Sequence, residues 1–304
     1  MEHDTSASVG REQRFECQGP ADIRAELDGG RLDITLEHGA DGTDGVSVHI
    51  RPDSTSPPQG NVGIGGLLSW LGEQTGATPA GALAAEAVRR TVIDFTDRRL
   101  TVRAPRDFPL RAVPLMIQVH APSGSSITAR SGSADVAVSG VAAGLDAATG
   151  SGQVRAQRCT GTAEVRTGSG DVRLGSILGR LQVRTGSGEV DVNSVEGAAS
   201  SGTVQTGSGD VRLGAVKRDV SARTGSGDLT VADACAGGLN LTTGSGQLRV
   251  GIHPGVLAEL DVSSGSGSAR SDLPVSGTPA EGDVALRVRA RSGSGDALVT
   301  AAPS

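Results

Sequence analysis

A Gly-Ser-Gly triplet, or a close variant of it, recurs through residues 132–295 and constrains the fold more than any other feature of the chain. Nine copies are present, and their central serines are spaced by 18, 18, 18, 21, 18, 19, 21 and 28 residues. A period of this size predicts a solenoid, in which each repeat forms one coil that stacks on its neighbours. The central serines are Ser133, Ser151, Ser169, Ser187, Ser208, Ser226, Ser245, Ser266 and Ser294.

Apolar residues alternate with polar ones after each triplet, which is the two-residue period of a β-strand. Val154, Val172 and Val190 hold the first inward position in three successive repeats. A second alternating stretch, such as Leu181 and Val183, leads to the next triplet. Each coil of 18–21 residues therefore contains two predicted strands. About nine such coils, stacked as parallel strands, form an all-β parallel β-solenoid with a core of small aliphatic side chains.

The glycines of the triplets are predicted to form the corners between strands. Glycine adopts positive φ without strain, and it lets the backbones of adjacent coils approach closely because it has no Cβ. A column of Thr residues precedes the corners, and their hydroxyl groups are expected to form a hydrogen-bonded ladder along the axis. The corner glycines predicted on this basis are Gly168, Gly170, Gly186, Gly188, Gly207, Gly209, Gly225 and Gly227.

The chain divides into three predicted parts. Residues 1–53 are a strand-rich segment that forms either irregular first coils or a capping sheet. Residues 54–90 are an insertion that begins as a Pro- and Ser-rich loop and continues as a helical hairpin, whose second helix runs from Thr78-Pro79 to about Arg90. Residues 91–302 return to strands and carry the repeats.

The insertion is the segment that most suggests a contact, since it contains the only Trp of the chain. The candidate partner contacts are Leu67, Leu68, Trp70 and Leu71, which lie within about two turns of helical spacing. Two interpretations remain open. The hairpin covers an open end of the solenoid, or it docks on a partner protein or a membrane surface. The lack of nearby Lys or Arg disfavours the membrane.

Composition narrows the classes of function. The net charge is −6 and aromatic residues make up 1% of the chain, so neither the basic surface nor the stacking platforms of a nucleic-acid-binding protein are present. The sequence lacks an 18-residue apolar run and a signal-peptide pattern, and this predicts a cytoplasmic protein. Three widely spaced cysteines, Cys17, Cys159 and Cys235, fit neither a zinc motif nor a disulfide scaffold and are expected to be reduced thiols.

Three stretches of sequence together resemble a known family. They are GGRLDITLEH, the lead QVHAPSGSSITARSGS, and the TGSGDVRL-like units. They are similar to a bacterial family of candidate adhesins built from β-strand repeats, a domain of unknown function related to the head domain of predicted autotransporter adhesins. The resemblance covers roughly Phe15–Pro52 and Arg90–Ala302. It implies a right-handed, single-stranded parallel β-helix, in agreement with the usual handedness of parallel crossovers. It supplies no catalytic residues.

The acidic position after each triplet allows two chemical alternatives. The sequence GSGD is similar to calcium-binding nonapeptide repeats, but Gln153 and Gln247 interrupt the column that Asp171 and Asp210 belong to, and interleaved Arg residues indicate a solvated face. Carboxylates on adjacent coils also lie ~5 Å apart, as paired acid and base groups in glycosidases do. No aromatic-lined cleft accompanies them. No metal, cofactor or catalytic residue is therefore assigned.

Two further residues are interpreted as core positions. His253 and Cys159 both fall in a column that is otherwise mostly aliphatic, so each is predicted to be a buried structural residue. The function predicted from the sequence is a non-enzymatic structural or protein-interaction β-solenoid. Its expected partner is an unidentified protein or a second copy, contacted through the ends or faces of the solenoid. The alternative is a surface adhesin or a polysaccharide-active β-helix protein.

Overall fold

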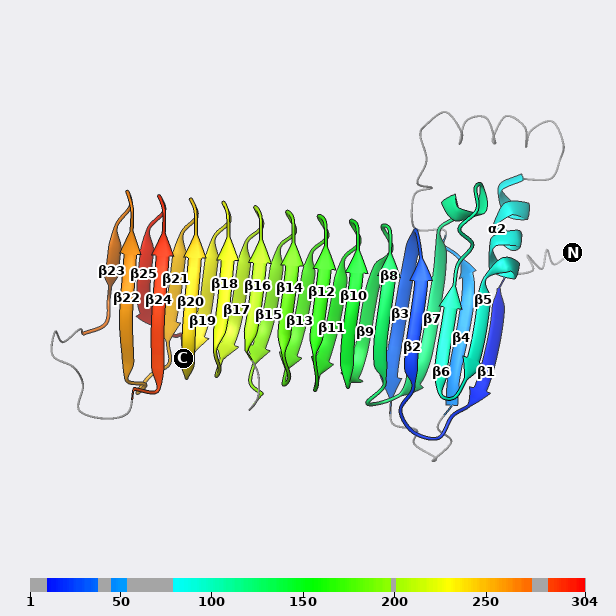
Figure 1. Cartoon of the computed structure of the whole chain (residues 1–304), viewed down its shortest axis with the longest axis horizontal. Coiled ribbons are helices and arrows are strands. Elements are labelled where there is room, and N and C mark those ends of the chain that lie inside the picture. The colour runs from blue at the N-terminus through cyan, green and yellow to red at the C-terminus, as the bar shows by residue number, and fades with distance from the viewer. Residues whose placement is uncertain (1–9, 38–44, 54–78, 198–200, 275–283, 304) are drawn as a thin grey trace, which may run out of the picture. The chain divides into compact units, whose positions relative to one another are not determined.

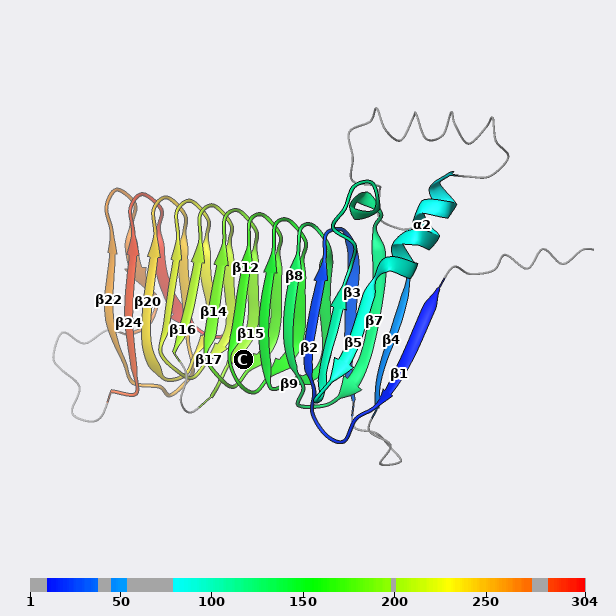
Figure 2. The same ribbon diagram turned by 45° about the vertical axis from the view of Figure 1, so that its right-hand side comes forward.

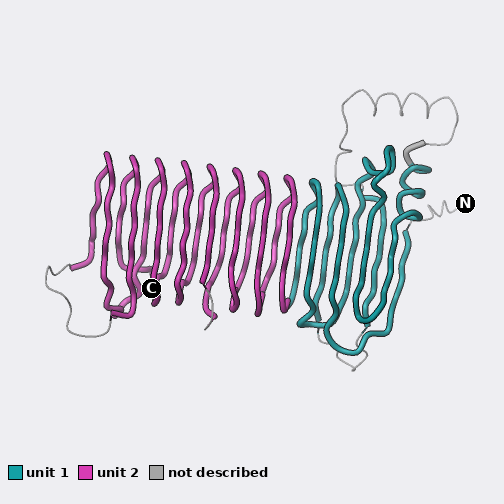
Figure 3. Tube along the Cα trace, viewed as in Figure 1, with its two compact units in different colours: residues 1–140 teal, residues 141–304 magenta. Residues whose placement is uncertain are grey.

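The computed structural model describes residues 10–37, 45–53, 79–197, 201–274 and 284–303. It divides into two compact units, residues 1–140 and residues 141–304 (Figure 3). The described residues are nearly all in strands or the turns between them, so the all-β prediction is confirmed.

Unit 2 consists of two parallel sheets, to which the strands contribute alternately along the chain (Figure 1). The turned view separates the sheet of β12, β14 and β16 from that of β15 and β17 (Figure 2). In spatial order, the strands of the first sheet are β10 (Gly144–Thr149), β12 (Ala163–Thr167), β14 (Leu181–Thr185), β16 (Gly202–Thr206), β18 (Val220–Thr224), β20 (Gly237–Thr243), β24 (Leu286–Ser292) and β22 (Ala258–Ser264). Those of the second are β11 (Val154–Cys159), β13 (Val172–Ile177), β15 (Val190–Val195), β17 (Val211–Val216), β19 (Leu229–Ala234), β21 (Leu248–Ile252), β25 (Ala297–Ala301) and β23 (Ala269–Ser271).

The register of these sheets follows the sequence period. Val154 pairs with Val172, and Val172 with Val190, so equivalent residues of successive repeats lie side by side. Their side chains point between the two sheets and are fully buried. One strand from each sheet, with the turns that join them, therefore makes one coil of a β-solenoid.

The order of coils in space departs from the order in the chain at one end of unit 2. The coil β24–β25 lies between β20–β21 and β22–β23, although it follows both in sequence. The inward residues of β24, Leu286, Val288 and Ala290, are buried. The inward residues of β22 are only half-buried. The coil with the better apolar face thus takes the inner place, which is where burial gains most.

Unit 1 also contains two sheets with parallel strands, but its edge strands pair antiparallel. One sheet has the order β1 (Arg11–Glu16), β4 (Gly45–Pro52), β7 (Leu115–Pro122), β3 (Gly30–Glu37) and β9 (Asp135–Ala142, which belongs to this unit up to Gly140). The other has the order β8 (Ser126–Ser131), β2 (Asp22–Leu27), β6 (Arg99–Arg103) and β5 (Val92–Thr96). The strands β2, β3, β6, β7, β8 and β9 pair in parallel, whereas β1, β4 and β5 pair antiparallel. The rings of Phe15 and Phe95, on edge strands β1 and β5, stack with their centroids 5.0 Å apart.

A helix, α2 (Pro79–Arg90), occupies the position of the second helix expected in the insertion. It packs on β4 and on the short 3₁₀ helix η1 (Leu110–Ala112), and it buries Ala87 and Val88. The Arg11 guanidinium donates a hydrogen bond to the carbonyl of Thr91, at 2.8 Å, just beyond the end of the helix. The helix is thus attached to the strands of its own unit.

Candidate functional site

The corner glycines are required by close packing between coils. A Cβ built on Gly170 would lie less than 3.0 Å from the carbonyl oxygen of Gly152, and one built on Gly188 equally close to that of Gly170. The same holds for the second glycine of each corner in the middle of unit 2. The expected positive φ is wrong, however, because none of these corner glycines is among the described glycines that have positive φ. The reason is the turn itself, which needs close approach and not a left-handed backbone.

Backbone hydrogen bonds join one corner to the next. The N–H groups of Gly186 and Ser187 both donate to the carbonyl of Gly168, at 2.9 and 3.1 Å. The hydroxyl group before the corner contributes as well, through bonds to the backbone. Thr224 Oγ1 accepts the N–H of Gly227 at 3.0 Å and donates to the Gly209 carbonyl at 3.1 Å. At Thr224, Thr243 and Ser292 the expected bonds between hydroxyl groups are therefore corrected to bonds from each hydroxyl to a glycine carbonyl of the neighbouring coil.

The acidic column also bonds to the backbone. Asp210 Oδ1 accepts the N–H of Asp228 at 2.9 Å, and Asp228 Oδ1 accepts the N–H of Gln247 at 2.8 Å. Asp171 makes the equivalent bond to Glu189 and is paired with Arg173. One oxygen of each of these carboxylates is therefore used to join neighbouring coils.

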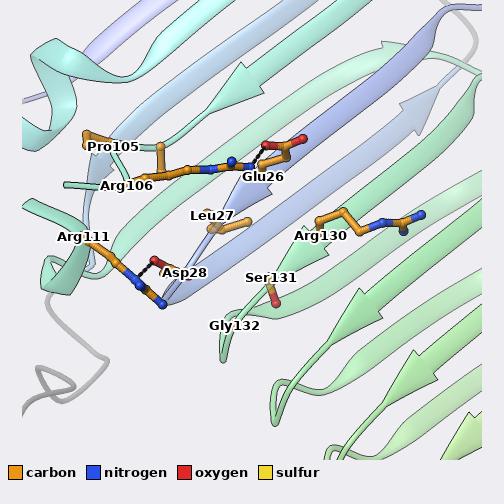
Figure 4. Close-up of a pocket in the computed structure, with 10 residues that line it drawn as sticks. Glu26, Leu27, Asp28, Pro105, Arg106, Arg111, Arg130, Ser131 and Gly132 are labelled. Atoms are coloured by element: carbon orange, nitrogen blue, oxygen red, sulfur yellow. Dashed lines mark hydrogen bonds and ion pairs between the residues drawn. The ribbon is translucent and has the colours of Figure 1, made fainter.

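A cavity of about 360 Å³ lies in unit 1, between the end of β2 and the segment after β6 (Figure 4). Arg106 reaches toward Glu26, and Arg111 toward Asp28, so both acids of the cavity form ion pairs. Ser131 Oγ donates to the Ala134 carbonyl at 2.9 Å. No His, Cys or Lys is among the described residues that line it. The serine hydroxyl thus donates to a main-chain carbonyl, and both carboxylates of the lining are paired with arginines.

A second group of chemically reactive side chains, Asp233, Cys235 and His253, lies where strands β19 and β21 end. His253 Nδ1 is 3.0 Å from Asp233 Oδ1, and Cys235 Sγ is 3.5 Å from Asp233 Oδ2. One ligand atom from each of the three residues lies within 4.8 Å of the other two. Burial, and after it the hydrogen bond and charge of Asp233, raises the pKa of the Cys235 thiol, while Lys217 lowers it.

The position of His253 corrects the sequence interpretation. Its side chain is 51% exposed and is not in the core. The pairing between β19 and β21 shifts by one residue between Val231 and Ala234, so Ile252 takes the buried position next to Ala234. The sequence did contain a signal for this group, since Cys235 and His253 are 18 residues apart, one repeat period. Cys159, by contrast, is fully buried, as its column predicts.

Leu67, Leu68, Trp70 and Leu71, the predicted partner contacts, lie outside the described residues. Arg106 and Arg111 of the unit 1 cavity come from segments without a repeat, and no sequence pattern pointed to them, whereas Arg130 stands just before the first triplet.

A family model covers most of the solenoid. It is described as Toastrack DUF4097 and matches residues 89–300, more than half of the chain. The chain belongs to the Toastrack DUF4097 family. This agrees with the family resemblance read from the GSGD repeats.

A comparison with solved structures finds matches from several bacteria. A candidate adhesin from Bacteroides fragilis is 11% identical, with 96% of each chain covered and a TM-score of 0.37. A candidate adhesin from Parabacteroides distasonis is 8% identical, with 96% of this chain and 98% of that chain covered and a TM-score of 0.33. A candidate cell adhesion protein from Clostridium sporogenes is 10% identical, with 96% and 99% covered and a TM-score of 0.21.

At these identities and TM-scores, no residue role is transferred from the solved structures to this chain. No curated protein sequence matches the chain. Among the described residues, no helix has the length and apolar character needed to cross a membrane.

Proposed function

We propose that this Toastrack chain is a non-enzymatic structural module, a right-handed β-solenoid of about nine coils, that binds another protein at the outer edge of the β22–β23 coil. The observation that carries the proposal is this edge. Within unit 2, β22 and β23 are the outermost strands of their sheets. An outermost strand leaves backbone N–H and C=O groups available to a further strand.

The side chains at the edge favour a protein strand as the partner. Ala258, Leu260 and Val262, the inward residues of β22, are half-buried, and Leu257 beside them is 45% exposed. A further coil stacked on this edge would bury these groups, as β24 does on the other side.

The charged side chains of β22 further restrict which partner strand fits this edge. On the outer face of β22, Glu259 pairs with Arg287 at 3.2 Å and Asp261 with Arg289 at 3.0 Å, both on β24. The exposed acidic row of β22 therefore fits a partner strand that alternates basic and apolar residues, as β24 itself does. Two β22 edges facing each other would bring like charges together, which disfavours edge-to-edge pairing of two copies.

The proposal includes a cytoplasmic location. It is supported by the three cysteines, all of which are thiols in the structure. Reduced thiols are typical of a cytosolic protein.

The test uses a labelled peptide of residues 285–303, which contains the Arg-rich strand β24, added to the full-length protein. Fluorescence anisotropy is expected to show saturable binding that weakens in a Glu259→Lys, Asp261→Lys double variant. A peptide with Arg287 and Arg289 changed to Glu is the matched control and is expected not to bind. Absence of binding by the first peptide, or equal binding by the control, would reject the edge as the site. Reproducible binding on a glycan array would favour the surface-adhesin or polysaccharide alternative.

A further inference from the structure

We propose that Asp233, Cys235 and His253 form a binding site for one divalent transition-metal ion of the zinc class. The three residues offer a carboxylate, a thiol sulfur and an imidazole nitrogen, which are the protein ligands that zinc uses. The ligand atoms lie within 4.8 Å of one another. A tetrahedral zinc ion bound at about 2.0–2.3 Å holds its ligand atoms roughly 3–4 Å apart, so small side-chain movements suffice to close the site.

The ligands come from two adjacent coils that are already fixed by backbone bonds. Cys235 follows β19, and its N–H donates to the Val216 carbonyl at 2.8 Å. His253 follows β21, and its N–H donates to the Ala234 carbonyl at 3.0 Å. Asp233 lies within the irregular pairing of β19 and β21. Irregularities of this kind re-aim side chains and are common next to functional sites.

Comparison with the other coils indicates that these residue types are not required by the repeat. The same backbone bond to the preceding coil is made by Leu178, Glu196 and Lys217 at the positions equivalent to Cys235 and His253. In the register, Ser194 and Ala215 occupy the position of Asp233. The solenoid therefore accepts apolar, acidic, basic and small residues here, and packing alone does not explain a thiol, an imidazole and a carboxylate together.

The mixture of ligands selects the class of ion. Calcium and magnesium prefer oxygen ligands only, whereas sulfur and imidazole nitrogen favour zinc and its neighbours in the first transition row. The His253 side chain is 51% exposed, and that of Asp233 is 30% exposed. Water can therefore reach the site and complete a tetrahedral shell, an arrangement with three protein ligands and one exchangeable position.

The proposal is tested by titrating the reduced, metal-free full-length protein with Co²⁺. We expect one ion per chain, with a thiolate-to-cobalt charge-transfer band and the visible bands of a tetrahedral ion, both removed by competing Zn²⁺. Cys235→Ser is expected to abolish the charge-transfer band. His253→Gln and Asp233→Asn are each expected to weaken Zn²⁺ binding at least about tenfold, because even outer-shell changes cost that much at zinc sites.

Two variants serve as matched controls, Cys159→Ala for a thiol elsewhere and His120→Gln for an exposed imidazole elsewhere. Both are expected to bind Co²⁺ as the wild type does. Absence of the charge-transfer band in the wild type, or its survival in Cys235→Ser, would overturn the site. So would unchanged affinity in both His253→Gln and Asp233→Asn.

A second measurement is independent of spectroscopy. Because the ion would join two coils of the folded state, Zn²⁺ is expected to raise the melting temperature of the wild type and of both controls, but not that of Cys235→Ser. Melting curves without metal show whether each variant folds. No Zn²⁺-dependent rise in the wild type would count against the proposal. The peptide-binding edge at β22–β23 does not contribute a ligand, so either proposal can fail without the other.

Discussion

The middle coils of unit 2 and its final two coils are built from the same repeat but are arranged differently. From β10 to β21, each coil stacks on the one before it in the chain. At the end, β24–β25 lies between β20–β21 and β22–β23. The triplet thus determines how two coils align, whereas the apolar side chains determine which coil occupies an inner place.

The sharpest comparison uses two leucines that flank the same residue. Leu239 on β20 and Leu260 on β22 both pair with Val288 of β24, from opposite sides. Leu239→Ala is expected to cost about 2–5 kcal/mol of unfolding free energy, because it opens a cavity in a closed core. Leu260→Ala, at a half-buried position, is expected to cost about 1 kcal/mol. Urea denaturation of both variants measures this, and equal losses would contradict the assigned coil order.

The corner glycines of the middle coils and of the outermost coil are expected to differ in how much an added Cβ destabilises the fold. Gly170→Ala is expected to cost about 1–3 kcal/mol, since its Cβ would collide with the Gly152 carbonyl and coils on both sides prevent relief. Gly267 faces the Gly295 carbonyl in a similar way but lies on the outermost coil. Gly267→Ala is expected to cost less than about 1 kcal/mol, because that coil can shift outward. Thermal unfolding of the pair distinguishes the cases, and a larger loss in Gly267→Ala would show that the outer coil is as constrained as the middle.

The hydroxyl groups before the corners give a smaller contrast. Thr224→Val removes an acceptor for Gly227 and a donor to Gly209 at a buried site, so a loss of about 1–3 kcal/mol is expected. Ser264 makes the equivalent bonds to Gly267 and Gly295 on the outer coil, where water can replace it. Ser264→Ala is therefore expected to cost about 0.5–1 kcal/mol. Hydrogen exchange at the Gly227 and Gly267 amides tests whether each bond is lost as assigned.

The smallest expected effect depends on pH. The N–H and hydroxyl of Ser268 both donate to Asp296 Oδ1, and these bonds lower the pKa of Asp296. A carboxylate with a depressed pKa in the folded state stabilises that state above its unfolded pKa of about 3.9, and the stabilisation disappears as the pH falls through the lower folded value. Asp296→Asn is thus expected to melt slightly earlier than the wild type at neutral pH. The two melting temperatures should converge in acid, and a difference that grows in acid would contradict this role.

The sequence was sufficient for the repeating part of the fold because the alternation of side chains is strict there. Val172 and Leu174 are buried where the period places them, and a helix ends at Arg90, where the sequence predicted an end. The position of His253 could not be found in the same way. Counting a constant offset from the triplet places it in the core, but an irregular pair between strands moves the count by one residue. Such an irregularity depends on contacts between coils that a single strand does not specify.

The order of the last coils was also not predictable from the triplets. Ser266 and Ser294 belong to nearly identical motifs, so the local sequence does not rank one coil above the other. The ranking depends on how much apolar surface Leu286 and Val288 bury in comparison with Leu260 and Val262, which is a property of the assembled core. The expectation of positive φ at the corners was wrong for a different reason. A glycine in the sequence indicates either a need for backbone freedom or a need for the absence of a Cβ, and the sequence does not say which.

The exchanged position of β24–β25 has a consequence for how the protein is made. A ribosome delivers β22–β23 first, at a time when the strand that each will finally pair with has not yet been synthesised. The coil β20–β21 likewise waits for a neighbour that arrives later in translation. A nascent chain that stalled before Leu286 would therefore leave β22–β23 without its final partner and β20–β21 with only one of its two neighbours. The final pairing at this end of the molecule is therefore complete only when residues up to about Ala301 have emerged.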